Sequence, residues 1–529
     1  MKELIRSTTL PTERMTHLSG EQRDLLPLAV GKFLDTAATA TARATFYNTR
    51  AEQETAVEAV HQDLFALDRG IYTAALLLPG VTDFSRQIGA VRLLRTAQSD
   101  GLLSPEQEGS AVRGLLRMLP PQRMLKMFGM LRAERVNNAR TRRLILSTLL
   151  GADNLEFWAV KYRRKLATAL IHAWGRRTAS IVRAVLAKPA DDRTDKERQI
   201  VQRHVHRFVN GHDHDRVEQC VRFVLGDEDG LTLRRLAAYR GAKTDLLAGR
   251  VLPFETLEGL RSRFHRGKTS AEVLALTKSH LTTGQKMGMQ RKAAESDVAI
   301  EFDPAQYDAV RLYVYAYEMG SSETIRDELL RKARATAERL PVRFEHVGIL
   351  LDVSASMVGH ETQARRPISV ALALRDLLAE TAERATIATS DGRVAPAAEL
   401  IEPAGDTSLA AGLIAVLRRE PDTVFVLTDG YENAPAGRFA EVVRAVRRMG
   451  VKTPIHQFSP VFAAEARGIR SLCETVPGLP VSKPEAIGLG LLKALFEADV
   501  ERGAAALLGM VRPTIEAAGP PARRELPLG

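Results

Sequence analysis

The chain has 529 residues, of which 45% are hydrophobic and 26% charged, and its formal net charge is +11. The length predicts several domains, and the hydrophobic content excludes a wholly disordered chain. Two cysteines exclude a disulfide scaffold and a cysteine-rich zinc fold, and they fit a reducing cytoplasm. Every apolar run is shorter than a membrane span and the N-terminus lacks the apolar core of a signal peptide. We therefore expect a cytoplasmic protein with no membrane partner.

The positive charge is concentrated in one part of the chain. Residues 1–340 contain 54 Lys and Arg against 41 Asp and Glu, a net charge of +13, whereas residues 341–529 contain 21 and 23, a net charge of −2. Residues 101–200 alone hold 20 basic and 9 acidic side chains. Such a concentration favours a local binding site for a polyanion over a general aid to solubility.

Residues 1–340 predict helices throughout. Apolar residues recur at three- and four-residue spacing in segments such as 51–65, 155–173, 303–318 and 321–339. Proline and glycine turn signals separate these segments, and convincing strand alternation is absent. An all-α region of this length with short connections is typical of a solenoid of helical hairpins. Because we find no clean sequence period, a non-repeating helical bundle stays open as the alternative.

The pattern changes near Pro341. The apolar runs 347–351 and 423–427 predict buried parallel strands. Three weaker strands are expected near 386–389, 453–458 and 469–476, with helices at 367–384, 408–419, 437–449 and 484–499. Strands that alternate with helices predict a doubly wound α/β domain over 341–503. The Ala-, Pro- and Gly-rich residues 504–529 are expected to form a C-terminal tail.

Carboxylates and hydroxyls follow the two strong strands. Asp352, Ser354 and Ser356 come directly after the first strand, Asp429 comes after the second, and Thr407 lies in a loop between them. These segments meet at the carboxyl edge of such a sheet, where ligands bind. Hard oxygen donors suit Mg²⁺ and leave one coordination position for an acidic ligand. The pentapeptide taken alone also fits a simple cap of the following turn.

A second candidate site is the basic part of the helical region. Pairs such as Arg113 and Arg117 share a helix face, and few acids lie nearby to neutralise them, so RNA phosphates are the expected partner. Interleaved Trp158, Tyr162 and Trp174 could stack on unpaired bases, unless the tryptophans are core residues and the arginines a solvated face. The run also contains Arg142 and Arg177, and the candidate RNA-binding residues in it are Arg113, Arg117, Arg123, Lys126, Arg132, Arg135, Arg140, Arg143, Lys161, Arg163, Arg164, His172, Arg176 and Arg183.

The hydroxyl and carboxylate set resembles the metal-ion-dependent adhesion site of a von Willebrand factor A domain, over about residues 345–500. A basic helical array followed by such a domain resembles the Ro autoantigen family, which combines a TROVE module of HEAT-like repeats with an A domain. The run 161–164 (Lys-Tyr-Arg-Arg) resembles that family's Lys-Tyr-Arg helix start, and Arg183 with Lys188-Pro189 matches a later motif. Thr178 and Leu186 replace histidines of that motif, and Arg176 takes its tryptophan position.

The resemblance implies a multidomain protein with an all-α HEAT-like helical-repeat ring over 1–340, followed by an α/β doubly wound, Rossmann-like A domain. The ring would hold single-stranded 3′ ends of misfolded or structured RNA, and its outer basic face would hold a small noncoding Y RNA. A 3′-to-5′ exoribonuclease would be the partner that cuts. Residues that could line the hole are Lys278, His280 and Lys286.

Competing enzyme signatures are absent from the sequence. There is no phosphate-binding P-loop and no nucleophile elbow, and the metal site lacks an evident general base. The run 212–215 (His-Asp-His-Asp) is interpreted as a solvated loop. These absences favour a noncatalytic protein, and the resemblance to the Ro family implies an RNA-binding scaffold in RNA quality control. The alternative is a metal-dependent protein-adhesion adaptor whose basic helical face is incidental.

Overall fold

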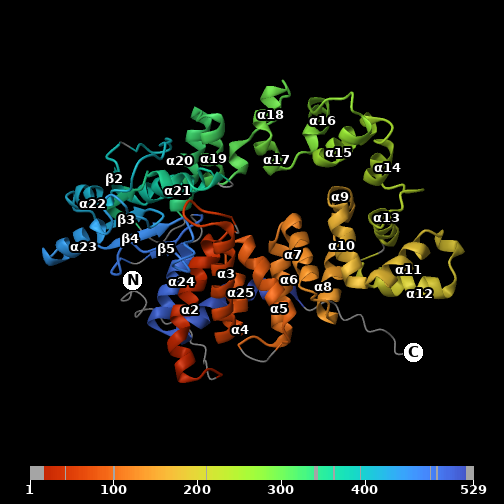
Figure 1. Ribbon diagram of the computed structural model, residues 1–529, viewed down its shortest axis with the longest axis horizontal. Coiled ribbons are helices and arrows are strands. Elements are labelled where there is room, and N and C mark those ends of the chain that lie inside the picture. The colour runs from red at the N-terminus through yellow and green to blue at the C-terminus, as the bar shows by residue number, and fades with distance from the viewer. Residues whose placement is uncertain are drawn as a thin grey trace. The chain divides into compact units, whose positions relative to one another are not determined.

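The computed structural model describes residues 17–519 except 42, 99–101, 210, 212, 339–342, 362–363, 394, 477 and 484–486. Packing divides the chain into two compact units. Unit 1 contains residues 1–89, 98–115 and 303–529, and unit 2 contains residues 90–97 and 116–302. Figure 1 labels most of the helices and strands of both units. Among these elements, no helix has the length and hydrophobicity needed to cross a membrane.

Unit 1 contains a parallel sheet with the strand order β2-β1-β3-β4-β5. The strands are β1 (Phe344–Leu351), β2 (Ala382–Thr389), β3 (Thr423–Leu427), β4 (Ile455–Ser459) and β5 (Gly478–Pro480). Strand β1 lies between β2 and β3, so Leu351 is level with Thr389 on one side and Leu427 on the other. Both strong predicted strands are therefore neighbours, and they end at the same edge.

The last strand was predicted in the wrong place. It lies at Gly478–Pro480 and not near 469–476. The backbone of the earlier segment bonds to a side chain, because Gln457 donates to the Arg470 carbonyl at 2.6 Å and accepts from the Leu472 amide at 2.9 Å. Backbone groups used in this way are not available to a strand ladder.

Helices α21 (Arg366–Glu380), α22 (Leu409–Leu417) and α23 (Arg438–Arg448) alternate with the strands. The core beside them is apolar and fully buried, and it includes Leu350, Leu413, Val424 and Phe439. Gly412 allows α22 to approach β1 closely, since a Cβ atom there would lie 2.5 Å from Leu350 Cδ1. The α/β part of the fold is thus confirmed as a small parallel sheet with packed helices.

The remaining elements of unit 1 are helical and pack on this α/β part. Helix α2 contacts α3 and α24, and α25 contacts α4, as Figure 1 shows with the first helices beside the last ones. An apolar cluster joins Ala56 and Phe84 to Phe462. These helices are α2 (Gly20–Thr39), α3 (Arg50–Leu67), α4 (Arg69–Leu76), α19 (Ala309–Met319), α20 (Glu323–Ala337), α24 (Ile487–Ala498) and α25 (Val500–Ala518), with the first parts of α5 (Asp83–Arg95) and α6 (Pro105–Met118).

The expected C-terminal tail is largely helical. Asp499 caps α25 by accepting hydrogen bonds from the Glu501 and Arg502 amides, and Leu507, Val511 and other apolar residues at helical spacing are buried. Residues 520–529 lie outside the described residues. In the structure, the first helices pack in the same unit as the α/β residues. The sequence predicted domain limits at residues 340 and 503, and those limits stay predictions.

The described elements of unit 2 are all helical, as expected. Helix α10 packs on α7 and on α8, and it also packs on α11 after a sharp turn at Gly175, whose φ of +82° suits a residue without Cβ. The helices are α7 (Pro121–Ala133), α8 (Ala139–Leu150), α9 (Leu155–Lys161), α10 (Arg163–Trp174), α11 (Arg176–Leu186), α12 (Asp195–His204), α13 (His214–Val224), α14 (Arg234–Gly241), α15 (Phe254–Phe264), α16 (Ser270–Thr277), α17 (Thr283–Gly288) and α18 (Gln290–Glu295).

Candidate functional site

The five candidate metal ligands meet at the carboxyl ends of β1 and β3. The Asp352 amide donates to the Leu427 carbonyl at 2.9 Å, which holds the two strand ends together. Exposed fractions are 0% for Asp352, 2% for Ser354 and Asp429, 4% for Ser356 and 1% for Thr407. The sheet topology therefore brings the expected residues together and buries them.

Hydrogen bonds fix the side chains of this site. The Ser354 and Ser356 hydroxyl oxygens lie 3.1 Å apart, and the Ser356 side chain interacts with the Asp429 carboxylate. One Asp352 oxygen accepts from the Ser354 amide at 3.0 Å, and the other accepts from the Thr428 hydroxyl at 2.7 Å. The donors are thus positioned before any ion binds.

Two residues that the sequence analysis missed hold the outer loops. The Asn433 carbonyl oxygen accepts from the Thr407 amide at 2.8 Å, and the Ala434 amide donates to the Thr407 carbonyl at 3.1 Å. Thr428 supports Asp352, as described above. Both Thr428 and Asn433 are polar residues within a few positions of Asp429, and this proximity is the sequence signal that indicates them.

Electrostatics at the site favour a bound cation. Burial raises the pKa of Asp352, and burial together with the charge of Asp352 raises the pKa of Asp429 to about 7. No Lys or Arg of the described chain forms an ion pair with either carboxylate. Two buried carboxylates and three hydroxyls form a hard-oxygen donor set that fits Mg²⁺. Nowhere among the described residues do three or more His, Cys, Asp or Glu side chains gather as a metal site, so a site here depends on the hydroxyls.

The candidate RNA-binding residues fall into two groups by exposure. Seven are half-buried, namely Arg113, Arg123, Arg140, Lys161, Arg163, His172 and Lys286. Ten are exposed, namely Arg117, Lys126, Arg132, Arg135, Arg143, Arg164, Arg176, Arg183, Lys278 and His280. The second group has the accessibility that contact with a phosphate backbone requires.

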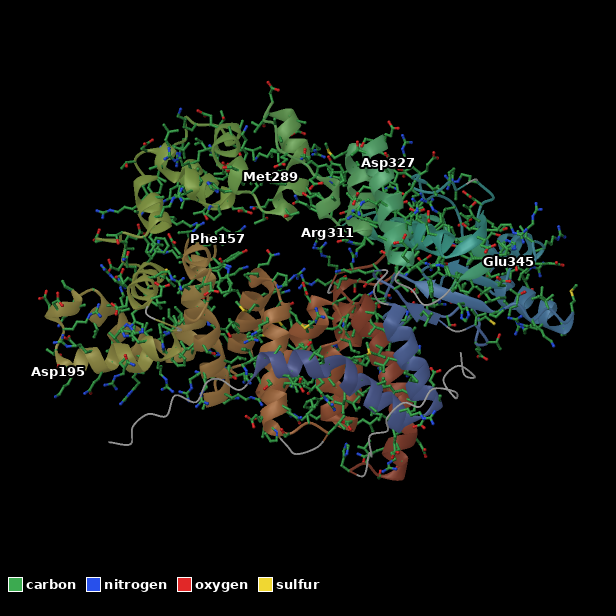
Figure 2. The ribbon with its side chains drawn as sticks, turned by 180° about the vertical axis from the view of Figure 1, so that it is seen from behind. Phe157, Asp195, Met289, Arg311, Asp327 and Glu345 are labelled. Carbon is green, nitrogen blue, oxygen red and sulfur yellow. The ribbon has the colours of Figure 1, made fainter. Side chains whose placement is uncertain are left out.

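Several half-buried members hold the protein together. Arg163 donates to the Phe223 carbonyl at 2.8 Å and to Glu228 at 2.6 Å. The Lys161 side chain is 12% exposed and lies 3.5 Å from Glu255. This ion pair could not be predicted, because the two residues are far apart in the sequence. Phe157, labelled in Figure 2, lies under Lys161, whose Nζ is 5.6 Å from the ring centroid. These cations already have protein partners.

Half-buried candidates outside this group have protein partners as well. Arg113 donates to the Ala518 carbonyl at 3.3 Å, and Arg140 donates to the Leu93 carbonyl. Lys286 lies 3.2 Å from Glu301. To bind these side chains, an RNA would have to replace their protein contacts, and breaking those contacts costs free energy. The role of these residues in RNA binding stays a prediction.

A group of exposed arginines lies where two helical hairpins turn. Arg132 lies in the last turn of α7, Arg135 in the following loop, and Arg142 at the start of α8. His172 near the end of α10 bonds to the Val136 carbonyl at 2.9 Å, which brings the α10–α11 turn to this loop. We name this group the basic edge, and its members are Arg132, Arg135, Arg142, Arg143, Arg176 and Arg177.

The basic edge keeps its charge. The acid in the same loop, Glu134, is paired with Arg95 at 3.1 Å. None of the six arginines has an ion pair within the part of the chain that the structure describes. Arg164 and Lys165 are also exposed, but they lie at the opposite end of α10 from His172.

Trp174 has the second of the two roles that the sequence left open, that of a core residue. Its side chain is buried, with 8% exposed, and its indole N–H donates to the His204 carbonyl at 3.2 Å. Burial and a satisfied N–H identify it as a core residue. Trp158 and Tyr162 are half-buried and keep part of their ring surface accessible.

No family model matches the chain, and no curated protein matches it. Among solved structures, the chain is similar to the crystal structure of the Deinococcus radiodurans RO (RSR) protein. The sequences are 16% identical, the TM-score is 0.43, and the alignment covers 91% of this chain and 95% of that chain. At this level of identity, the similarity defines the position of no functional residue.

Proposed function

We propose that this protein is a noncatalytic RNA-binding scaffold of the Ro type. The observation that carries the proposal is the basic edge, a set of six exposed arginines on adjacent helical turns without protein counter-ions. An uncompensated cluster of this kind attracts a polyanion, and binding releases the counter-ions condensed on RNA phosphates.

Arginine suits this role better than lysine would. Its planar guanidinium group can give two parallel hydrogen bonds to one phosphate, and it stays charged at all physiological pH values. Placement on helix ends and turns leaves these side chains able to follow an irregular RNA backbone. The half-buried Trp158 and Tyr162 on α9 and at its end add accessible ring surface for unpaired bases.

The resemblance to the Ro family extends the proposal to particular RNAs. A HEAT-like helical ring would hold single-stranded 3′ ends of misfolded or structured RNA, with Lys278 and His280 exposed for contact. A Y RNA would bind the outer basic surface. The protein would present the RNA to a 3′-to-5′ exoribonuclease and would not cut it.

The metal site has a separate role in this proposal. Asp352, Ser354, Ser356, Thr407 and Asp429 would hold Mg²⁺, which would supply positive charge between the two buried carboxylates. The chain's own residues fix the geometry, because Thr428 orients Asp352 and Asn433 orients the Thr407 loop. An acidic ligand at this site is the basis of the alternative function, a protein-adhesion adaptor.

A binding titration tests the RNA proposal. The probe is a labelled hairpin RNA with a single-stranded 3′ tail, titrated with the full chain at two salt concentrations. We expect Arg132→Glu/Arg142→Glu to weaken binding about 100-fold at low salt, since two cations near phosphate become repulsive. The matched control is Arg444→Glu/Arg448→Glu, which changes the same charge on exposed residues of α23 and should leave binding nearly unchanged.

The result that would contradict the proposal is an equal effect of the two double variants, or no binding by the wild type at low salt. Asp352→Asn should spare RNA binding. If it abolished RNA binding in a folded protein, the separation of the two sites would be wrong.

A further inference from the structure

The candidate metal site faces a segment that lies much earlier in the sequence, the connection between α2 and α3. Residues 40–49 connect α2 to α3, and Thr41 and residues 43–47 line a cavity of about 40 Å³ together with residues of the site. The lining includes Thr45 and Tyr47 from the connection and Ser356, Asp429 and Arg366 from the α/β part. A space of this size holds one or two water-sized groups.

Tyr47 is the residue of this connection that touches the site. Its side chain lines the cavity together with Ser356 and Asp429, and its hydroxyl interacts with the Ser356 side chain. Its ring stacks on Tyr431, with centroids 3.7 Å apart, and the Tyr431 amide donates to Asp429 at 3.1 Å. One tyrosine thus reaches both a hydroxyl donor and the segment that holds a carboxylate donor.

The position of Tyr47 is fixed by its neighbours in sequence. Asn48 donates to Glu465 at 2.8 Å and accepts from the Ala464 amide at 3.2 Å. At the start of α3, Gln53 donates to the Phe462 carbonyl at 3.1 Å. The segment around Tyr47 is therefore attached on its C-terminal side to the loop that follows β4.

We propose that this connection is the internal ligand segment of the metal site, with Tyr47 as a positioning residue that acts through Ser356. Ion binding at the site and docking of helices α2 and α3 then stabilise each other. The inference rests on the proposed Mg²⁺ site and adds what occupies its outer face. It places the site inside the chain, where an acidic residue of a partner protein cannot reach unless Tyr47 leaves.

The coupling has a physical basis in the single proton of the Ser356 hydroxyl. Three neighbouring oxygens can accept this proton, those of Ser354 at 3.1 Å, of the Asp429 carboxylate and of Tyr47. A cation beside Asp429 would weaken that carboxylate as an acceptor and leave the proton to Tyr47. By thermodynamic reciprocity, the Ser356–Tyr47 bond must then favour the cation by the same factor.

Trypsin protection and calorimetry on the full chain test this coupling. Arg43 and Arg50 flank Tyr47, so cleavage after them reports on docking of the segment, and cleavage after the exposed Arg266 in unit 2 is the internal control. We expect MgCl₂ to slow cleavage after Arg43 and Arg50 relative to EDTA, and to leave cleavage after Arg266 unchanged. The protection should vanish in Asp352→Asn.

Tyr47→Phe keeps the ring and removes only the hydroxyl. We expect it to bind Mg²⁺ about fivefold more weakly in calorimetry, the effect of losing one hydrogen bond, and to lose most of the Mg²⁺-dependent protection. Its melting temperature in EDTA should match the wild type, which shows that it folds.

Two results would overturn the inference. One is equal cleavage of the wild type with Mg²⁺ and with EDTA, and the other is wild-type Mg²⁺ affinity in Tyr47→Phe. Neither result changes the RNA titration, so a failed inference is distinguishable from a failed RNA proposal. A wild type that binds no Mg²⁺ at all would remove both the metal site and its internal ligand.

Discussion

The metal site and the basic edge are built in opposite ways. At the metal site, five polar side chains are at most 4% exposed, and hydrogen bonds hold Asp352, Ser354, Ser356 and Asp429 in place. At the basic edge, six arginines are exposed on helix ends and turns, and the nearby acid is committed elsewhere. Both regions gather like charges, but one buries them and the other presents them to solvent.

The difference follows from the ligand each region would bind. A small divalent ion demands oxygen atoms at fixed positions, so the donors must be ordered in advance and water must be limited. A phosphate backbone is long and variable, so accessible cations with free rotamers serve it better. Substitutions at the metal site should therefore change one interaction sharply, whereas substitutions at the basic edge should act gradually and without loss of fold.

The largest effect we expect is on stability, at Trp174, which lies in the basic part of the sequence but is a core residue. Trp174→Ala should lower the free energy of unfolding by about 3–5 kcal/mol, because it empties a buried site. Trp174→Phe should cost less and leave the affinity for RNA unchanged. Denaturant unfolding of both variants and an RNA titration of Trp174→Phe check this. Weakened RNA binding by a folded Trp174→Phe would assign this tryptophan to the interface.

The next effect separates the two ends of α10. Arg176→Glu/Arg177→Glu at the basic edge should weaken binding of the tailed hairpin by roughly 100-fold, and Arg164→Glu/Lys165→Glu should weaken it less. All four residues are exposed, so the melting temperatures should stay near that of the wild type. Equal losses from the two pairs would mean that the RNA covers a broader surface than the basic edge.

An effect of similar size concerns the ion. Saturating MgCl₂ at about 100 times its dissociation constant should raise the free energy of unfolding by roughly 3 kcal/mol, and Asp352→Asn should abolish the increase. Asp327→Asn, at an exposed acid on α20, is the matched control and should keep it. Calorimetric melting with MgCl₂ and with EDTA measures both. An increase that survives in Asp352→Asn would place the ion elsewhere.

The smallest effect we expect is on the pH dependence of stability, at a buried carboxylate that has a counter-ion. Asp35 on α2 lies 2.9 Å from Lys493 on α24, and burial raises its pKa from 3.8 to about 6 against the opposing effect of Lys493, with Glu497 adding to the rise. The folded protein then holds this proton more tightly than the unfolded chain does. The stability contribution is therefore fully present below about pH 4 and is lost as the pH rises to about 6.

Asp35→Asn should flatten this part of the stability profile by about 1–2 kcal/mol between pH 4 and pH 6. Urea unfolding of both proteins across this range is the measurement. An unchanged slope would show that another group sets the pH dependence.

Local patterns were sufficient to find the metal-site donors. Asp352, Ser354 and Ser356 follow a buried strand directly, and parallel topology alone brings them to Asp429. Tyr47 could not be found in this way, because it reaches Ser356 only through the packing of α2 and α3 on the α/β part. No pattern near residue 47 indicates such a contact.

Charge counts located the basic region but not its accessible members. Lys161 and Arg163 looked equivalent to Arg164 in sequence, yet Glu255 and Glu228 arrive from distant helices and engage the first two. Trp174 likewise looked equivalent to Trp158, because both tryptophans lie among the basic residues in the sequence. Exposure depends on which helices pack together, and a degenerate helical array has no sequence period that reveals this.

The most direct test of the central claim is the salt dependence of RNA binding by the full chain, measured with the 3′-tailed hairpin by fluorescence anisotropy. The account predicts tight binding at low salt and a linear fall of log affinity against log salt concentration. It also predicts that each basic-edge arginine replaced by Glu lowers the slope by about one. Binding that is absent at low salt, or whose slope is the same in Arg132→Glu/Arg142→Glu as in the wild type, would contradict it.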